Sequence, residues 1–375
     1  MSLTDALEQV TTVAAANADQ VDANGAFPSA AVDALRGSGL LGLILPEKVG
    51  GLGAGPSEFT EVVRELATAC GSTAMVYLMH AAAAVTVAAA PPSGMPELLS
   101  TMASGDSMGT LAFSERGSRS HFWAPVSRAA LSDDGSAVKL RADKSWVTAA
   151  GYADVYIVST GSASGVAGEV DLYAVPNSVA GFTVVAPFAG MGLRGNASSP
   201  MTIDATIPVA SRLGQEAAGF GLMMQTVLPW FNLGNAAVSL GLAGAAYSAT
   251  IAHAGSARLE HLGQSLSALP TIRAQIARMG TALAAHRAYL NHAAASVSAP
   301  DDETLIHVLG VKASANDAAL AITESAMRVC GGAAFSKHLP IERAFRDARA
   351  GAVMAPTADA LYDFYGKAVT GLPLF

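Results

Sequence analysis

The spacing of hydrophobic residues changes twice along this chain, and that double change restricts the fold more than any other feature. Over residues 1–109 apolar residues recur every three or four positions, which is the spacing of amphipathic helices. Over residues 110–217 short β-prone runs are separated by turns rich in Gly, Asp and Asn. The helical spacing returns in residues 218–375. The sequence therefore predicts an α+β protein with a helical N-terminal domain, a β-barrel or sandwich in the middle and a helical C-terminal domain.

The individual elements follow from capping and turn residues. We expect helices to begin near Ser29, Ser57 and Ser72, and a long helix to follow Asp301 and end near Val329. Asp133-Asp134-Gly135 predicts a hairpin turn. The predicted strands are Thr110–Phe113, Val138–Ala142, Ser145–Thr148, Val155–Ser159, Asp171–Val175, Phe182–Ala186 and Met201–Ile207.

Composition limits the classes of partner. Hydrophobic residues make up 51% of the 375 positions, enough for a large core and a subunit interface. The formal net charge of −8 argues against nucleic acid or an anionic membrane as a partner. The two cysteines, Cys70 and Cys330, indicate reduced thiols. The N-terminus is polar and the apolar run 81–90 is shorter than the ~20 residues of a membrane span, so we expect a cytoplasmic protein outside the membrane.

The most specific stretch is residues 330–357, CGGAAFSKHLPIERAFRDARAGAVMAPT. Its Gly331-Gly332 pair breaks a helix and lets a ligand or another backbone approach. Pro340 ends any preceding helix, and a new helix follows it. Arg343 and Asp347 stand four positions apart on that helix, so they share a face and can form an ion pair.

The order of these features resembles the C-terminal signature of the acyl-CoA dehydrogenase family. In that family the loop after Arg-Asp-Ala usually reads Tyr-Glu-Gly-Thr, and its Glu removes the α-proton of the acyl-CoA. The matching residues here are Met354, Ala355, Pro356 and Thr357. The resemblance extends over nearly the whole chain and implies the helical–β–helical fold, with a four-helix bundle as its C-terminal domain. It also places Ala355, which offers only its backbone N–H, where the catalytic base is expected.

Two motifs in the middle part resemble the family's flavin-binding segments. Residues 113–120, FSERGSRS, resemble its Thr-Glu-Pro-Gly-x-Gly-Ser loop. By this resemblance Ser114 bonds the flavin pyrimidine, and Ser120 lies near both cofactor and thioester. Residues 144–151, KSWVTAAG, resemble its Lys-x-Trp-Ile-Thr-Asn-Gly strand, in which Trp146 would pack on the isoalloxazine and Thr148 would bond near its N5. The implied cofactor is FAD.

The resemblance also implies a site shared between subunits. In the family a partner subunit binds FAD through an Arg-containing segment, which maps onto Arg258 here, and through the Gly-Gly segment, which maps onto Gly331 and Gly332. Arg258 stands one position earlier than the family pattern. Thr357 matches a family hydroxyl near the flavin. A homodimer or homotetramer is therefore expected.

The missing base leaves a short set of candidates. Asp359 lies four residues past Ala355 and is the first candidate for a relocated base, against the alternative of a solvated or helix-capping Asp. The other titratable candidates are Glu115, Asp363 and His80.

Trp230 and Phe231 add bulk where the family's acyl tail runs, so both are candidate substrate contacts. His80 is a third such candidate, although a lone His on an apolar helix is more often a core residue. The family's supporting Arg is replaced by Asn232.

Three functions are compatible with this sequence. The first is an FAD-dependent oxidoreductase that oxidises the α,β bond of an acyl thioester, with CoA as carrier, a non-standard base, and an electron-transfer flavoprotein or oxygen as acceptor. The second is a flavin-dependent monooxygenase or a redox-neutral acyl-CoA-processing enzyme on the same fold. The third is a scaffold subunit without flavin, against which the retained Ser114 and Trp146 motifs argue. We expect no metal site.

Overall fold

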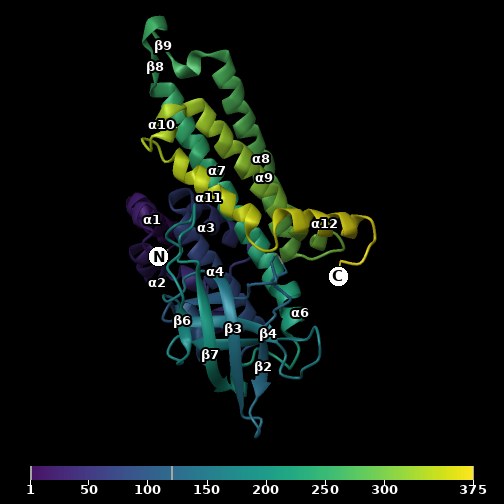
Figure 1. The fold of residues 1–375 in the computed structure, drawn as a ribbon. Helices are drawn as coiled ribbons and strands as arrows, with labels where there is room; N and C mark the ends of the chain where they lie inside the picture. The colour runs from purple at the N-terminus through teal and green to yellow at the C-terminus, as the bar shows by residue number, and fades with distance from the viewer. Residues whose placement is uncertain (1, 120, 375) are drawn as a thin grey trace.

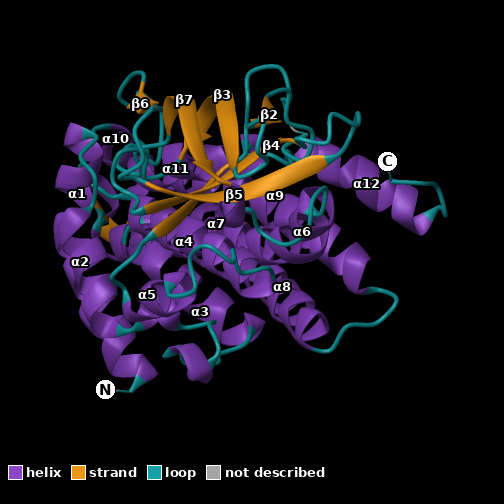
Figure 2. Cartoon of the chain, turned by 90° about the horizontal axis from the view of Figure 1, so that it is seen from below, coloured by secondary structure: helices purple, strands orange, loops and turns teal. Residues whose placement is uncertain are grey.

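The computed structural model describes residues 2–119 and 121–374. Figure 1 shows a β-sheet at one end and the long helices α7 (Leu228–Ser256), α8 (Pro270–Ser298) and α9 (Thr304–Cys330), which extend away from it, while α12 (Ala358–Val369) projects to one side. Figure 2 shows the sheet against a layer of helices that includes α4 and α7. The helical–β–helical order predicted from the hydrophobic spacing is confirmed.

The N-terminal part is helical, as expected. Ser2 begins the first helix with a capping box, in which the Ser2 hydroxyl and the Asp5 carboxylate each accept from the other residue's backbone N–H. Gly25 ends it in the left-handed conformation, with a φ of 60°. The elements are α1 (Leu3–Asn24), α2 (Ser29–Ser38), 3-10 turns Leu40–Gly42 and Glu47–Val49, α3 (Pro56–Ala69), α4 (Gly71–Ala89) and α5 (Leu98–Ser104).

The middle part forms one seven-stranded mixed sheet. Its order is β1-β4-β2-β3-β7-β6, and β5 pairs with the second side of β4. Along β7 buried and less buried residues alternate, as in a strand with one face on the core. The strands are β1 (Gly109–Ala112), β2 (Arg128–Leu131), β3 (Ala137–Val147), β4 (Val155–Gly161), β5 (Val170–Pro176), β6 (Phe182–Val184) and β7 (Ser199–Pro208).

Two strand predictions need correction. The runs 138–142 and 145–148 are one strand, β3, interrupted by a bulge between Lys144 and Val147. Strand β2 was not predicted, because its residues, RAAL, include no β-branched or aromatic side chain. The predicted Asp133-Asp134-Gly135 turn is confirmed, since it joins β2 to its antiparallel neighbour β3.

The C-terminal part is a bundle of long helices. Near its start, a short π-helical turn, Met223–Val227, lies between helices α6 and α7. Helices α4 and α9 have the length and apolar character of a membrane span, but 83% and 61% of those windows are buried inside the protein, as in core helices. The elements are a 3-10 turn Val209–Ser211, α6 (Gly219–Leu222), α7 (Leu228–Ser256), β8 (Arg258–Leu259), 3-10 turns Glu260–Leu262 and Leu266–Ala268 around β9 (Gln264–Ser265), α8 (Pro270–Ser298), α9 (Thr304–Cys330), α10 (Gly332–Phe335), α11 (Ile341–Val353) and α12 (Ala358–Val369).

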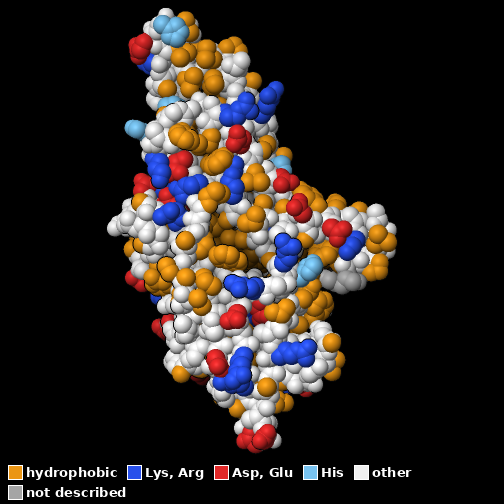
Figure 3. Space-filling model, viewed as in Figure 1, with side chains coloured by type: hydrophobic (Ala, Val, Ile, Leu, Met, Phe, Trp, Pro, Cys, Tyr) orange, Lys and Arg blue, Asp and Glu red, His pale blue; other side chains and the backbone are white. Residues whose placement is uncertain are grey.

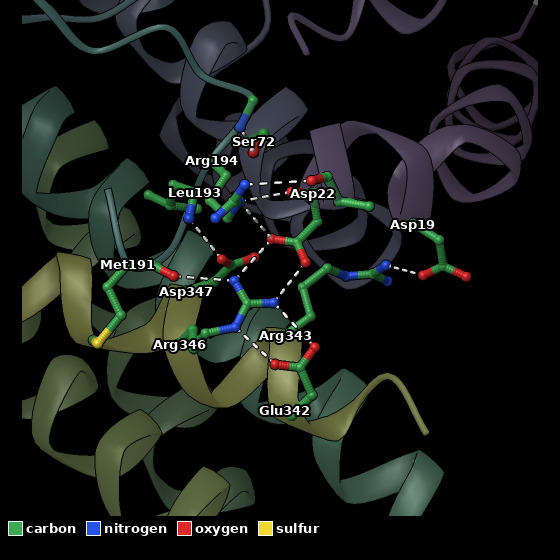
Figure 4. A network of polar contacts seen from close by, with 12 residues as sticks. Asp19, Asp22, Ser72, Met191, Leu193, Arg194, Glu342, Arg343, Arg346 and Asp347 are labelled. Atoms are coloured by element: carbon green, nitrogen blue, oxygen red, sulfur yellow. Dashed lines mark hydrogen bonds and ion pairs between the residues drawn. The ribbon is translucent and has the colours of Figure 1, made fainter. Parts of the chain in front are cut away.

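A polar network joins α1 to α11, and Figure 4 shows it. The guanidinium of Arg346 donates to both carboxylate oxygens of Asp22, at 2.8 and 2.5 Å, and also to Glu342. Arg343 pairs with Asp19 of α1 and not with Asp347, so the predicted Arg343–Asp347 pair is wrong. Asp347 is instead buried and accepts from the backbone N–H of Leu193 at 2.6 Å. Arg343 and Arg346 of α11 both reach carboxylates of α1, so these long side chains join the two helices.

Candidate functional site

A hollow lined by hydrophobic side chains lies between the sheet and the junction of α11 and α12, as Figure 3 shows in the view of Figure 1. Three segments that were identified from the sequence lie in the sheet, its loops and the α11–α12 junction. They are the loop 113–127 that follows β1, the end of β3, and the segment Met354–Thr357, called the junction segment below.

The loop 113–127 is fixed to the sheet by a buried ion pair. The ammonium of Lys144 lies 2.5 Å from Oε1 of Glu115, and both side chains are at most 1% exposed. Oε2 of Glu115 accepts the backbone N–H groups of Val126 and Ser127, at 2.7 and 2.8 Å. Burial raises the pKa of Glu115, but Lys144 and the hydrogen bonds from Ser127 outweigh it and hold the pKa below its usual value. Glu115 is thus an anchor of the loop and is not available as a base.

The predicted cofactor hydroxyls lie on this loop. Ser114 is half-buried, and its carbonyl accepts the N–H of Ser145 in β3 at 2.8 Å. A backbone hydrogen bond therefore holds the loop to the strand that carries Trp146, in addition to the ion pair. The other predicted residue of the loop, Ser120, lies outside the described residues.

Trp146 is the most unusual side chain of the sheet. It is 67% exposed although it is a large aromatic residue. Its φ of 56° lies in the left-handed region, which a bulky residue adopts only when its surroundings impose it. This conformation falls in the bulge of β3 and directs the indole outward, where Phe188 meets it edge-on with ring centroids 6.5 Å apart. The neighbouring Thr148 is buried, and its hydroxyl lies 3.0 Å from that of Ser198.

The junction segment contains the position where a base was expected. Ala355 is half-buried and is followed by Pro356 in a cis peptide bond. The hydroxyl of Thr357 caps α12 by accepting the N–H of Ala360 at 3.4 Å. Asp359 is exposed in the first turn of α12, and Asp363 is paired with Lys367 at 3.1 Å. Of these two carboxylates, only Asp359 is therefore without an ion pair among the described residues.

Sequence reasoning missed a buried lysine beneath the junction segment. Lys312 of α9 is completely buried, and its ammonium donates to the carbonyls of Gly351, Met354 and Pro356. Burial lowers the pKa of Lys312 to about 7. The sequence did contain a signal, because this lysine stands within an otherwise apolar helical run, LGVKASA. Burying a lysine ammonium costs free energy unless the ammonium is hydrogen-bonded.

His80 occupies the core. It is completely buried in α4, its Nε2 donates to the carbonyl of Leu41 at 3.0 Å, and its Nδ1 accepts the N–H of Gly109 at 3.0 Å. The Gly109 contact fixes this tautomer. Burial lowers the pKa of His80 to about 4. Both ring nitrogens are thus used inside the protein, which supports the core interpretation over a substrate contact.

Trp230 and Phe231 lie in the first turn of α7, next to the π-helical turn, an irregularity that is frequent at functional sites. Trp230 is half-buried and meets Phe59 edge-on at 5.2 Å, while Phe231 is 9% exposed. Asn232 is buried and donates to the carbonyl of Val308 at 2.9 Å, but its Oδ1 has no partner among the described residues.

The last three predicted residues lie away from the sheet. Arg258 is exposed in the β8–β9 hairpin, which Figure 1 shows at the far tip of the long helices. Gly331 and Gly332 are also exposed, and no atom lies within 4 Å of where their side chains would begin. One chain therefore does not bring Arg258 and Trp146 together. The glycine backbones are open to a ligand or a second chain.

Among the clefts in the described part of the protein, two lie beside strand β4. The larger, about 540 Å³, lies beside the loop 113–127 and is lined by residues 123–128, residues 161–162 and 165–170, and Phe220. The smaller, about 310 Å³, lies between α5 and β4 and contains no predicted site residue. The larger cleft is not lined by a predicted site residue either, so neither cleft locates a ligand at the site.

Comparison with known proteins identifies the three parts of the chain. Residues 3–106 match the model described as "Acyl-CoA dehydrogenase, N-terminal domain". Residues 110–206 match the "middle domain" of the same family, and residues 217–369 match its "C-terminal domain". Together these matches cover most of the sequence.

Individual relatives agree with these matches. A probable acyl-CoA dehydrogenase of Bacillus subtilis, YngJ, is 28% identical over 346 residues, which cover 89% of this chain and 88% of that protein. The human mitochondrial short-chain specific acyl-CoA dehydrogenase is 29% identical over 338 residues, covering 88% and 80%. The structure of butyryl-CoA dehydrogenase from Megasphaera elsdenii superposes with a TM-score of 0.90 over 99% of both chains at 23% identity, which shows a shared fold.

Proposed function

The chain belongs to the acyl-CoA dehydrogenase family, and from this premise we propose that it is an FAD-dependent oxidoreductase that acts on the α,β bond of an acyl thioester carried by CoA. The observation that carries the proposal is Trp146, an exposed indole held in a left-handed conformation by a bulge. An exposed and conformationally constrained aromatic side chain is suited to a planar ligand.

The residues present fit a flavin. Ser114 would contact the ring system from the anchored loop, and Trp146 would pack against it. Thr148 would bond near its reactive edge from a position already fixed by Ser198. Arg258 and the open backbones of Gly331 and Gly332 would come from a second copy, since one chain places Arg258 at the opposite end of the molecule from the sheet. When bound, FAD supplies an acceptor for a hydride and its two electrons.

At the substrate, the polar groups that this chain would contribute are then mostly backbone groups. The N–H of Ala355 is proposed to hold the thioester carbonyl, which acidifies the α-carbon. No carboxylate occupies the junction segment. Asp359 stays our candidate for the proton acceptor because it is exposed and without an ion pair among the described residues. Trp230 and Phe231 would limit the length or shape of the acyl group.

Anaerobic addition of acyl-CoA thioesters to the FAD-loaded protein tests this function. A panel of short linear, branched and cyclic acyl groups is mixed with the enzyme, and the visible absorbance of oxidised flavin is followed. We expect at least one thioester to bleach the flavin and to yield the α,β-unsaturated product by mass spectrometry. Failure of the whole panel would overturn the proposed oxidation.

The replacement of a carboxylate by Ala355 also favours a second candidate, in which desaturation has been lost. A flavin-dependent monooxygenase would consume oxygen when the flavin is reduced externally. A redox-neutral enzyme would convert a CoA ester without bleaching. A protein that does not bind FAD would indicate a scaffold role.

The proposal also covers the domain divisions, the oligomeric state, the location and the electron acceptor. We propose domain divisions after residues 109 and 217, a homodimer or homotetramer, and a cytoplasmic location. An electron-transfer flavoprotein or oxygen would reoxidise the flavin. Sedimentation of the FAD-loaded protein checks the oligomer, and limited proteolysis checks the divisions.

A further inference from the structure

The ammonium of Lys312 binds the backbone on both sides of Ala355. It donates to the carbonyls of Gly351 at 2.9 Å, Met354 at 3.2 Å and Pro356 at 2.9 Å. The ammonium also lies 3.3 Å from Oδ1 of Asn316, so its three N–H groups are all engaged inside the protein. No ion pair joins Lys312 to a carboxylate within residues 2–119 and 121–374. Among the described residues, its charge is therefore stabilised by carbonyl dipoles, three from the backbone and one from an amide side chain.

These carbonyls need a donor for a structural reason. The last carbonyls of a helix have no partner within it, and they form the negative end of its dipole. Gly351 lies in the last turn of α11, and Met354 is its C-cap. Pro356 lies two positions before the first residue of α12, next to its N-cap Thr357. Lys312 thus satisfies the end of one helix and the approach to the next from a third helix, α9.

A second side chain leaves this backbone little freedom. Asn316 links Lys312 to α7, because its Oδ1 lies 3.3 Å from the ammonium and its Nδ2 donates to Oδ1 of Asn235 at 2.9 Å and to the hydroxyl of Ser239 at 2.8 Å. A side chain added at Gly351 would begin 2.4 Å from Asn316 and 2.8 Å from Ser239. The backbone beside the junction segment is therefore packed directly against α7 and α9, with no room for a larger residue.

We propose that Lys312 is a positioning residue for the reaction, because it fixes the backbone of Met354–Pro356 and so the direction of the Ala355 N–H. The inference rests on the proposed function and deepens it. Where a base side chain is absent, the backbone N–H is the polar group that the junction segment still offers to a thioester. A displacement of about 1 Å in such a group can cost ~10²-fold in rate.

The test compares Lys312→Met with a matched control, Arg349→Met. Arg349 also joins α11 to α9, through a hydrogen bond to Thr323 at 2.9 Å, but among the described residues no hydrogen bond joins it to the junction segment. Stopped-flow reduction of the FAD-loaded proteins gives the limiting rate and the apparent Kd for the thioester that bleaches the wild type. For Lys312→Met we expect the limiting rate to fall by ~10²-fold with Kd changed by less than about threefold, and for Arg349→Met both within about threefold.

Hydrogen exchange and thermal unfolding separate positioning from stability. In Lys312→Met we expect faster amide exchange confined to peptides that cover residues 352–361, whereas Arg349→Met leaves that region at the wild-type rate. Equal rate losses in the two variants, or a loss of rate in Lys312→Met without faster exchange there, would overturn the positioning role. If Lys312→Met does not fold, Lys312→Gln, which keeps one donor group, replaces it with the same expected direction.

Flavin bleaching in the wild type tests the proposed oxidation separately from the positioning role of Lys312. If no thioester bleaches the wild-type flavin, the proposed function fails, and the hydrogen-exchange comparison still decides whether Lys312 fixes the segment. Unchanged exchange at residues 352–361 in a folded Lys312 variant would overturn the inference even if the wild type is an active dehydrogenase.

Discussion

Replacing Lys144 with Met removes the ammonium from an ion pair that has no access to solvent. The side chains of Lys144 and Glu115 are 0% and 1% exposed, and their charged atoms lie 2.5 Å apart. Removing one partner of such a pair leaves a buried charge without its counterion, at a cost of ~3–5 kcal/mol. Glu115 keeps its hydrogen bonds from Val126 and Ser127, so we expect the lower end, about 3 kcal/mol. For a chain of this length that corresponds to a Tm lower by about 4 °C.

The measurement is thermal unfolding of the FAD-free protein, followed by titration with FAD. The loop 113–127 carries Ser114 and is held by this pair, so we expect FAD affinity to fall together with Tm. The control is Lys139→Met, which removes a surface ion pair with Asp204 and is worth ~0–1 kcal/mol. The double variant Lys144→Met/Glu115→Gln, which leaves no unpaired charge, should be more stable than Lys144→Met alone. If Lys144→Met unfolds at the same temperature as Lys139→Met, the pair does not anchor the loop and the reasoning is refuted.

Three further predictions address the site and the network beside it. Trp146→Ala should change stability by less than about 0.5 kcal/mol, because the indole is exposed, yet weaken FAD binding at least about tenfold, as flavin titration would show; unchanged affinity would remove Trp146 from the site. Asp359→Asn should slow thioester-dependent flavin reduction by ~10²–10⁴-fold if Asp359 is the base, and a rate equal to wild type would exclude it. Burial raises the pKa of Asp347 from its ordinary 3.8 to about 6, so between these values the folded state binds more protons than the unfolded state and the contribution of Asp347 to stability falls as pH rises. Denaturant unfolding of wild type and Asp347→Asn at pH 4 and 7 should therefore show the variant gaining stability relative to wild type at the higher pH; a constant difference would contradict the raised pKa.

The structure also explains why some predictions from the sequence were wrong or absent. Arg343 was expected to pair with Asp347 four residues on, but it pairs with Asp19, more than 300 positions away. Strand β2 was missed because its sequence, RAAL, has little strand preference, and pairing with β3 forms it. Both errors have the same origin, because long-range contacts replaced the local preference.

What the sequence determined by itself was the set of features encoded by local spacing. The hydrophobic period of each third fixed the helical–β–helical order, since that period follows from backbone geometry. The motif around Trp146 and the replacement of a carboxylate by Ala355 could likewise be read directly. Only the tertiary structure decided which buried groups meet. Lys312 and Pro356 are 44 positions apart, and their hydrogen bond exists because α9 packs beneath the end of α11. No local pattern encodes such a contact, since its partners are backbone carbonyls, which every residue has.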